Sequence, residues 1–158
     1  MAKNEQLRKI FREYEKTHDH LPATAREAVV WGVREGLAEL PKMDPYDALA
    51  DQMARALREE YKTDSEGRRY RVNHAVRVSK AGVQHTFWAI MGFAQRGHME
   101  KAFVQRREQI VGDCVQLQTD IDVYNGMNPK EEPMQTVLDF RDDVAERQAW
   151  LFEEKKAA

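Results

Sequence analysis

The sequence predicts a mainly helical α+β protein, and two observations carry this prediction. Most of the 158 residues lie in segments with apolar side chains at helical spacing, the longest of which runs from Met99 to Tyr124. Between Arg69 and Met91 the period changes to two, and the segment is rich in β-branched and aromatic residues. We therefore expect a three-helix unit and a β-hairpin, packed on a long C-terminal helix.

The composition favours a folded protein with a charged surface, because 42% of the residues are hydrophobic and 33% are charged. The formal net charge of −2 excludes a global positive field that would draw the chain to nucleic acid or a membrane. Cys114 is the single cysteine, so an internal disulfide is excluded. With no visible signal peptide and no apolar run long enough to cross a bilayer, we expect a cytoplasmic protein without a membrane partner.

Three helices are expected before the hairpin. The first covers Asn4–Thr17, where apolar residues recur at helical spacing. The second starts after Thr24, which forms a capping-box pattern with Glu27, and extends to about Leu40. The third covers Pro45–Tyr61, with proline in the first turn, where its missing N–H has no cost.

An antiparallel hairpin is expected after the third helix. Turn-forming residues at 63–67 and 79–82 bracket the first extended segment. The predicted strands are Arg69–Val78 and Val83–Met91. Both faces of the second strand carry large apolar side chains, so we expect it to be largely buried.

The helix from Met99 to Tyr124 carries an apolar stripe with a seven-residue repeat. A second row, made of Arg107, Cys114 and Ile121, lies four residues further along. This spacing is typical of one helix face or of a short coiled-coil seam. A glycine in mid-helix also suits a close helix crossing. The sequence therefore predicts a homodimer interface made of Phe103, Ile110, Gly112, Leu117 and Tyr124.

The C-terminal part is acidic. Residues 125–129 break the long helix, Pro133–Phe140 reads as either a short strand or a docked extended arm, and Asp142–Glu154 reads as a last helix before a frayed end. From Asp113 onward eleven acidic residues face five basic ones, a net charge of −6. This charge could pair with a basic region within a dimer, or it could simply be solvated. We expect residues 1–97 and 98–158 to form two parts of one continuous core.

The order of three helices and a hairpin over about Asn4–Met91 resembles a winged-helix DNA-binding domain. Its specific feature is the segment Lys62–Lys80, with six positive and two negative residues. The resemblance implies that cationic side chains of this segment hold phosphates. These residues are Arg68, Arg69, Arg71, Arg77 and Lys80. The third helix opposes this interpretation, because its net charge, −3 when the preceding Asp44 is included, would repel phosphates.

Two functions follow from these patterns. The first is a small DNA-binding protein, such as a transcriptional regulator, that acts as a homodimer. The alternative is a protein-interaction or scaffold module without nucleic-acid binding. In that case the basic residues are a solvated sheet face.

No catalytic residue, metal site or cofactor is predicted. The sequence has no glycine-rich phosphate loop and no HExxH, GxSxG or CxxC motif. His18-Asp19-His20 supplies only two imidazoles, and acids near a helix start are explained by the helix dipole. An enzyme site near His74, His85 and Arg107 is the least favoured alternative.

Three stretches of the C-terminal part look like a set of uncharacterised bacterial proteins. They are Arg106–Cys114, Asp120–Asn125 and Val137–Phe140, and the likeness covers the chain from about Arg55 onward. This resemblance implies no activity, cofactor or catalytic residue.

Overall fold

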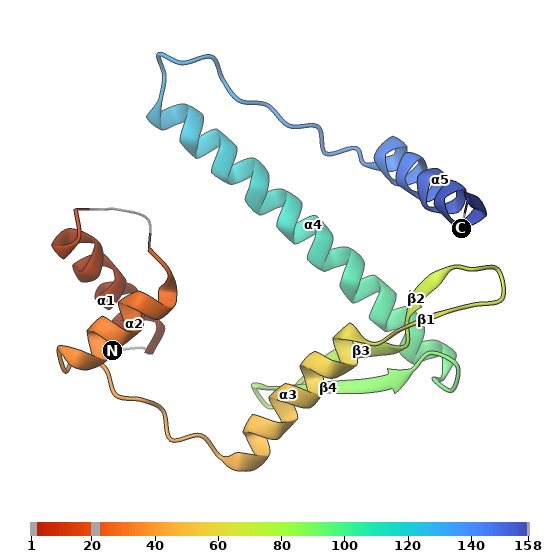
Figure 1. Ribbon diagram of the computed structural model, residues 1–158, viewed down its shortest axis with the longest axis horizontal. Helices are drawn as coiled ribbons and strands as arrows, with labels where there is room; N and C mark the ends of the chain where they lie inside the picture. The colour runs from red at the N-terminus through yellow and green to blue at the C-terminus, as the bar shows by residue number, and fades with distance from the viewer. Residues whose placement is uncertain (1–2, 20–22, 158) are drawn as a thin grey trace. The chain divides into compact units, whose positions relative to one another are not determined.

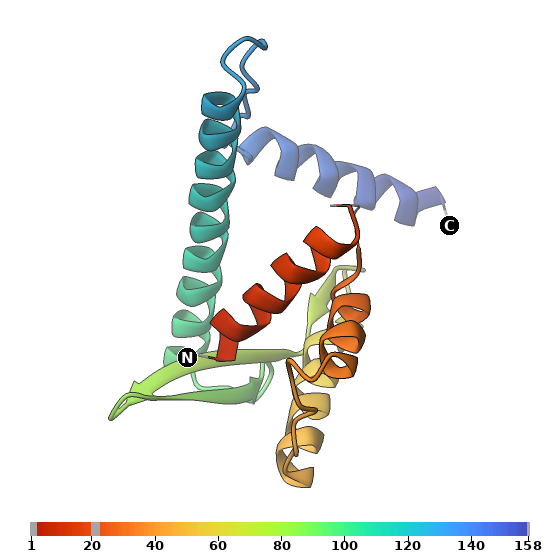
Figure 2. The ribbon, with the colours of Figure 1, turned by 90° about the vertical axis from the view of Figure 1, so that its left-hand side faces the viewer.

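The computed structural model describes residues 3–19 and 23–157 (Figures 1 and 2). The described chain is mainly helical, with two small antiparallel sheets, which confirms the predicted α+β class. In chain order the elements are α1 (Lys3–Thr17), α2 (Ala25–Arg34), α3 (Pro45–Glu59), β1 (Tyr61–Thr63), β2 (Arg69–Arg71), β3 (Asn73–Lys80), β4 (Val83–Ile90), α4 (Arg96–Met127) and α5 (Arg141–Ala157). The chain divides into two compact units, residues 1–51 and residues 52–158.

In the first unit, α1 and α2 pack closely because a glycine faces an isoleucine. A Cβ atom added at Gly32 would lie 2.6 Å from Cγ2 of Ile10, so only glycine allows this approach. Ile10 is buried in this contact, and Tyr14 meets the ring of Trp31 edge-on at 5.8 Å. α1 confirms the predicted first helix, and Ile10 is the residue of that helix that is buried against α2.

α2 starts as predicted, but the predicted end at Leu40 is wrong. Thr24 and Glu27 form the expected capping box, with the Glu27 N–H donating to Thr24 Oγ1 at 3.2 Å. The helix ends at Arg34 because Gly36 adopts a φ of +69°. The N–H groups of Gly36 and of the next residue donate back to carbonyls of the last turn, at 3.1 and 2.8 Å. This is the Schellman arrangement, which glycine favours.

The basic segment forms two hairpins where one was predicted. β2 pairs with β1, and β3 pairs with β4, with Lys80 opposite Val83 at the turn. The prediction that Arg69–Val78 forms one strand is therefore wrong. Val72 separates the two ladders, since its N–H donates to the carbonyl of Glu60 and its carbonyl accepts from the N–H of Met91.

Both hairpin turns use left-handed backbone conformations. Gly67 closes the first turn with a φ of +78°, and Ala81 and Gly82 form the second with φ values of +50° and +77°. Beyond that turn, β4 is not largely buried as predicted, because Phe87 and Ile90 are 49% and 48% exposed.

α4 contains the predicted long helix and exceeds it at both ends. It packs on β3 through His98, Ala102 and Gln105, of which Ala102 is completely buried. These residues lie on one helix face at spacings of four and three. β3 and α4 together form the centre of the second unit, with Val72 and Val76 as its buried apolar residues.

The segment that follows α4 is an extended arm without strand pairing in the described residues. The Asn125 side chain binds the backbone of Met134 twice, accepting from its N–H and donating to its carbonyl, both at 2.9 Å. Of the two predicted alternatives, the docked arm is therefore the observed one. α5 then continues to Ala157, so the predicted fraying from Lys155 is wrong up to that residue.

Among the helices that the structure describes, none has both the length and the apolar character that a bilayer crossing requires.

Candidate functional site

His74 lies at the junction of β2, β3 and α4. The side chain is only 3% exposed, and its Nε2–H donates to the carbonyl of Arg71 at 2.9 Å. The edge of the Phe103 ring faces the imidazole, with the ring centroids 5.5 Å apart. His98 of α4 donates from Nε2 to the carbonyl of His74 at 2.8 Å. These contacts fix the imidazole orientation and leave the proton of neutral His74 on Nε2.

The surroundings of His74 favour its neutral form. Burial lowers the pKa of His74 below its ordinary value, and the bond to the Arg71 carbonyl opposes this change. The positive charges of Arg106 and Arg71, and the nearby His98, lower the pKa of His74 further. The local field around this imidazole is therefore positive.

A small cavity of about 180 Å³ lies beside His74. Four arginines from four different elements line it: Arg58 from α3, Arg71 from β2, Arg77 from β3 and Arg106 from α4. We call this set the arginine pocket. Its other polar lining residues carry amide or hydroxyl groups, and they are Asn73, Thr86, Gln105 and Gln109. No aspartate or glutamate is among the residues that line the pocket.

Each wall of the arginine pocket is held by a specific contact. The Arg58 guanidinium lies over the Trp88 ring, with Cζ 5.4 Å from the centroid. Arg71 donates from Nε to the Tyr61 hydroxyl at 3.1 Å. The side-chain amide of Gln105 binds both the N–H and the carbonyl of residue 77, at 2.8 Å each. These contacts restrain β2, β3 and α4 around the cavity.

The pocket arginines differ from four other arginines of the same unit in their partners. Four arginines outside the pocket each contact a carboxylate: Arg68, Arg96, Arg107 and Arg141. Within the described ranges 3–19 and 23–157, no carboxylate pairs with any of the four pocket arginines. The carboxylate of Glu60 accepts instead from the amide of Asn73, at 2.7 Å. The positive charges of the pocket are therefore not neutralised by the chain's own described residues.

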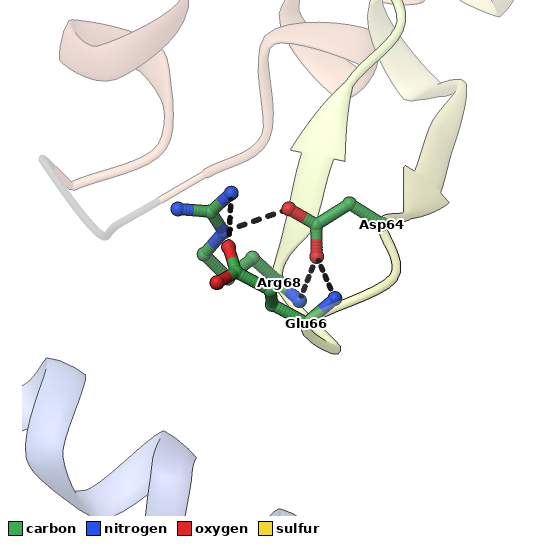
Figure 3. Close-up of polar contacts among 3 residues, drawn as sticks. All are labelled: Asp64, Glu66 and Arg68. Carbon is green, nitrogen blue, oxygen red and sulfur yellow. Dashed lines mark hydrogen bonds and ion pairs between the residues drawn. The ribbon is translucent and has the colours of Figure 1, made fainter.

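Of the residues predicted to contact phosphate, Arg68 is already neutralised in its own turn (Figure 3). Its Nε lies 2.7 Å from Asp64 Oδ2, and its Nη2 lies 2.6 Å from Glu66 Oε2. Asp64 also accepts from the backbone N–H groups of Glu66 and Arg68. The backbone and side-chain hydrogen bonds from Arg68 lower the pKa of the Asp64 carboxyl. Asp64 is therefore held in its charged form, and its ion pair with Arg68 lies within the turn.

The structure brings some of the other predicted residues together. Arg69 and Arg71 lie over the same Tyr61 ring, with Cζ at 4.0 and 5.9 Å from its centroid. Their two-residue spacing places both on one face of β2. Arg71 and Arg77 meet in the arginine pocket. Lys80 lies at the far end of β3, beside the turn.

Sequence reasoning missed Arg58 and Arg106 as partners of this site. Arg58 belongs to a helix whose net negative charge suggested repulsion of phosphates. Arg106 lies beside Arg107 in the long helix and outside the basic segment Lys62–Lys80. Since their convergence depends on tertiary packing, no local spacing indicated it.

The predicted dimer stripe of α4 is exposed in the single chain. Phe103, Ile110, Leu117 and Tyr124 are 48%, 56%, 45% and 43% exposed, and a Cβ atom on Gly112 would meet nothing within 4 Å. Part of the stripe borders an open groove of about 790 Å³, whose other side includes apolar residues of the arm. The groove is lined in part by Phe103, Ile110, Cys114, Leu138 and Phe140.

The structure does not gather the residues of the enzyme alternative. His85 pairs with Val78 on the hairpin, four residues along β3 from His74, and Arg107 contacts Glu108. In the described part of the chain no three His, Cys, Asp or Glu side chains are grouped as metal ligands. His18 stacks on Tyr14 at 3.9 Å, whereas His20 of the same predicted loop lies outside the described residues.

Comparisons with known proteins supply no relative from which a function can be transferred. The chain matches no protein-family model, no curated protein and no solved structure. The function is therefore argued from the contacts and charges of its own residues.

Proposed function

We propose that this chain is a small DNA-binding protein, such as a transcriptional regulator, that acts as a homodimer. In this proposal the two basic hairpins contact DNA phosphates and the apolar face of α4 joins the two copies. The supporting observation is that four of the five expected cations have no carboxylate partner among the described residues. These four are Arg69, Arg71, Arg77 and Lys80.

The geometry favours phosphate contacts through the hairpins. Tyr61 supports the side chains of Arg69 and Arg71, which reduces the conformational entropy that these long side chains lose on binding. A guanidinium offers a planar fork of donors that suits phosphate oxygens. α3 is not expected to enter the major groove, because Asp47, Asp51 and Glu59 would face the phosphates unpaired. The resemblance to a winged-helix domain therefore lies in the order of the elements. We assign the contact with DNA phosphates to the two hairpins.

The homodimer is supported by the exposed stripe on α4. Monomeric soluble proteins rarely expose contiguous apolar patches larger than a few hundred Å². The stripe extends from Phe103 to Tyr124, and Leu138 and Phe140 of the arm widen the apolar surface beside it. A second copy would cover this surface with an identical one, as two-fold symmetry allows.

DNA binding is tested by fluorescence anisotropy with mixed-sequence duplex DNA at about 50 mM and about 200 mM salt. We expect wild-type binding that weakens as salt rises, because cations on the protein displace condensed counterions. The variant Arg69→Glu/Lys80→Glu should bind at least about tenfold more weakly. The control Lys101→Glu/Lys130→Glu has the same change in net charge outside both hairpins, and it should bind nearly as well as wild type.

Two results would contradict this assignment. One is the absence of wild-type binding at the lower salt concentration. The other is an equal loss in both double variants, which would show that only net charge matters.

The second candidate is a protein-interaction module that does not bind nucleic acid. The exposed face of α4 favours it, since this face exists whether or not DNA is bound. The self-neutralised turn of Arg68 also removes one expected phosphate contact. A stable dimer by light scattering, combined with no DNA binding at low salt, would support this candidate over the first.

A further inference from the structure

The four pocket arginines bring four positive charges to one small cavity, and each of these residues is exposed to solvent. Like charges close together disfavour the folded chain, and an anion bound among them removes this repulsion. Arg96 and Arg107 of the same unit contact Glu100 and Glu108 within their own helix. The pocket, by contrast, gathers four arginines and has no acid among its lining residues.

The size of the pocket favours a small ligand. Its volume of about 180 Å³ lies below the range of roughly 300–1,000 Å³ that is typical of sites for drug-sized molecules. The four arginines that line it belong to four different elements, α3, β2, β3 and α4. A tetrahedral anion can accept from several such donors at once, whereas a single planar carboxylate presents only one edge.

Contacts within the chain restrain three of the four pocket arginines before any ligand arrives. Trp88 supports Arg58, and the Tyr61 hydroxyl orients Arg71. Gln105 fixes the backbone on which Arg77 stands. Such restraint lowers the entropic cost of binding. The pKa of His74 is lowered chiefly by burial, and the nearby charges of Arg106 and Arg71 lower it further, which agrees with cationic side chains beside its ring.

We propose that the arginine pocket binds a free phosphate or diphosphate group of a small molecule. The four guanidinium groups supply charge-assisted hydrogen bonds to the phosphoryl oxygens, and Thr86, Gln105 and Gln109 supply neutral donors. Binding would neutralise the pocket and tie α3 and α4 to the hairpins. This site would give the protein a small-molecule effector, and it does not require the protein to bind duplex DNA.

The pocket and the proposed DNA surface can be separated by mutation. Arg58 and Arg106 line the pocket but were not among the expected DNA contacts, whereas Arg69 and Lys80 are not among the pocket's lining residues. Arg71 and Arg77 are common to both and are therefore left unchanged. The phosphate-binding proposal for the pocket can then fail without the DNA-binding proposal failing, and the reverse also holds.

The test is isothermal titration calorimetry of the full chain with inorganic pyrophosphate at low and high salt. We expect saturable binding by the wild type with a defined stoichiometry. Arg106→Gln should weaken it about tenfold or more, the range of a lost charge-assisted hydrogen bond. Arg107→Gln is the matched control, since Arg107 is the next residue of α4 and contacts Glu108 outside the pocket. It should change the Kd less than twofold, within the small contribution of an exposed ion pair.

A local readout shows whether the ligand occupies the pocket itself. Trp88 lines the pocket, and its indole N–H gives an NMR cross-peak that Trp88→Phe identifies. Saturating pyrophosphate should shift this peak in wild type and in Arg107→Gln. The same concentration should shift it much less in Arg106→Gln. Arg106→Lys should bind with intermediate affinity, because it keeps the charge but loses the planar fork.

Three outcomes would overturn the proposal. They are no binding of pyrophosphate by the wild type at low salt, an equal loss in Arg106→Gln and Arg107→Gln, and an unmoved Trp88 peak at saturation. If duplex DNA shifts the Trp88 peak and pyrophosphate does not, the pocket holds a backbone phosphate and the free-ligand assignment is wrong. If Arg69→Glu/Lys80→Glu loses DNA binding but retains pyrophosphate binding, the two sites are distinct, as we expect.

Discussion

One face of α4 carries His98, Ala102 and Gln105 and packs on β3, whereas another carries Phe103, Ile110 and Leu117 and is exposed. The two faces lie about a third of a turn apart at 3.6 residues per turn. The polar face is thus the one that the chain uses for its own fold. The apolar face, which the hydrophobic pattern predicts to be a packing surface, is exposed, and in our proposal it contacts a second copy of the chain.

The polar face packs because it supplies hydrogen bonds to a strand. The backbone N–H and carbonyl of Arg77 bind the Gln105 amide, which replaces a neighbouring strand at this position. His98 adds a bond to the carbonyl of His74. Unpaired strand edges favour association with other chains, and covering them is a common protection. The packing of α4 on β3 therefore depends on matched polar groups. The small side chain of Ala102 allows the backbones of the helix and the strand to lie close together.

The largest expected effect comes from breaking the apolar face. Ile110→Asp/Leu117→Asp should convert the proposed dimer to a monomer, because each copy buries both side chains in a two-fold interface. Burying such side chains contributes roughly 1.5–3 kcal/mol each, so four of them contribute about 6 kcal/mol or more. This corresponds to a loss of about 10⁴-fold in dimer affinity. Light scattering coupled to size exclusion measures the mass.

Val123→Asp is the matched control for this prediction. Val123 is also exposed, but it lies well away from the stripe around the helix. The control should keep the mass of the wild type. A double variant with an unchanged mass would show that the stripe is not the interface, and a monomeric wild type would remove the homodimer altogether.

A smaller effect is expected from breaking the polar face. Gln105→Ala removes two hydrogen bonds and leaves the backbone of Arg77 unpaired at a strand edge, which should cost about 1–3 kcal/mol of unfolding free energy. Gln118→Ala is the control, because the Gln118 amide contacts only Asp122 of its own helix among the described contacts. It should cost a few tenths of a kcal/mol. Urea unfolding measures both, and equal values would show that the Gln105 contact does not stabilise the fold.

The sequence predicted the apolar face of α4 but not the polar face that packs on β3, and the reason is physical. Hydrophobic periodicity located the helix and its stripe, since both depend on local spacing. The partner of Gln105 is a backbone edge of β3, and backbone groups are the same in every sequence. No pattern of side chains therefore indicated that a glutamine and a histidine would form the packed face.

The same limit explains the other differences. The capping box of Thr24 and Glu27 is a local signal, and it correctly placed the start of α2. Gly36 is also a local signal for the end of a helix. The helix was nevertheless predicted to continue to about Leu40, because apolar residues follow Gly36. The arginine pocket depends on four elements far apart in sequence. Only Arg71 and Arg77, which belong to one basic segment, could be grouped beforehand.

The smallest expected effect is a pH dependence of the stability, which arises at His74 of β3. The His74 ring contacts Phe103 of the apolar face of α4. Because the pKa of His74 is lowered in the folded chain, the unfolded chain binds its proton first as the pH falls. The contribution of neutral His74 to stability is therefore complete above about pH 6.5 and declines below it. Part of this decline arises because protonation places a third positive charge beside Arg71 and Arg106.

We expect the free energy of unfolding of the wild type to be lower at about pH 5.5 than at about pH 7.5. His74→Gln should lose much of this difference, whereas His85→Gln, on the exposed part of β4, should keep it. Urea unfolding at both pH values provides the measurement. If His74→Gln and wild type show the same pH dependence, protonation of the buried imidazole beside the arginine pocket does not cause it. Retention of the pH dependence in His85→Gln and its loss in His74→Gln would place the effect where the polar face of α4 meets the arginine pocket.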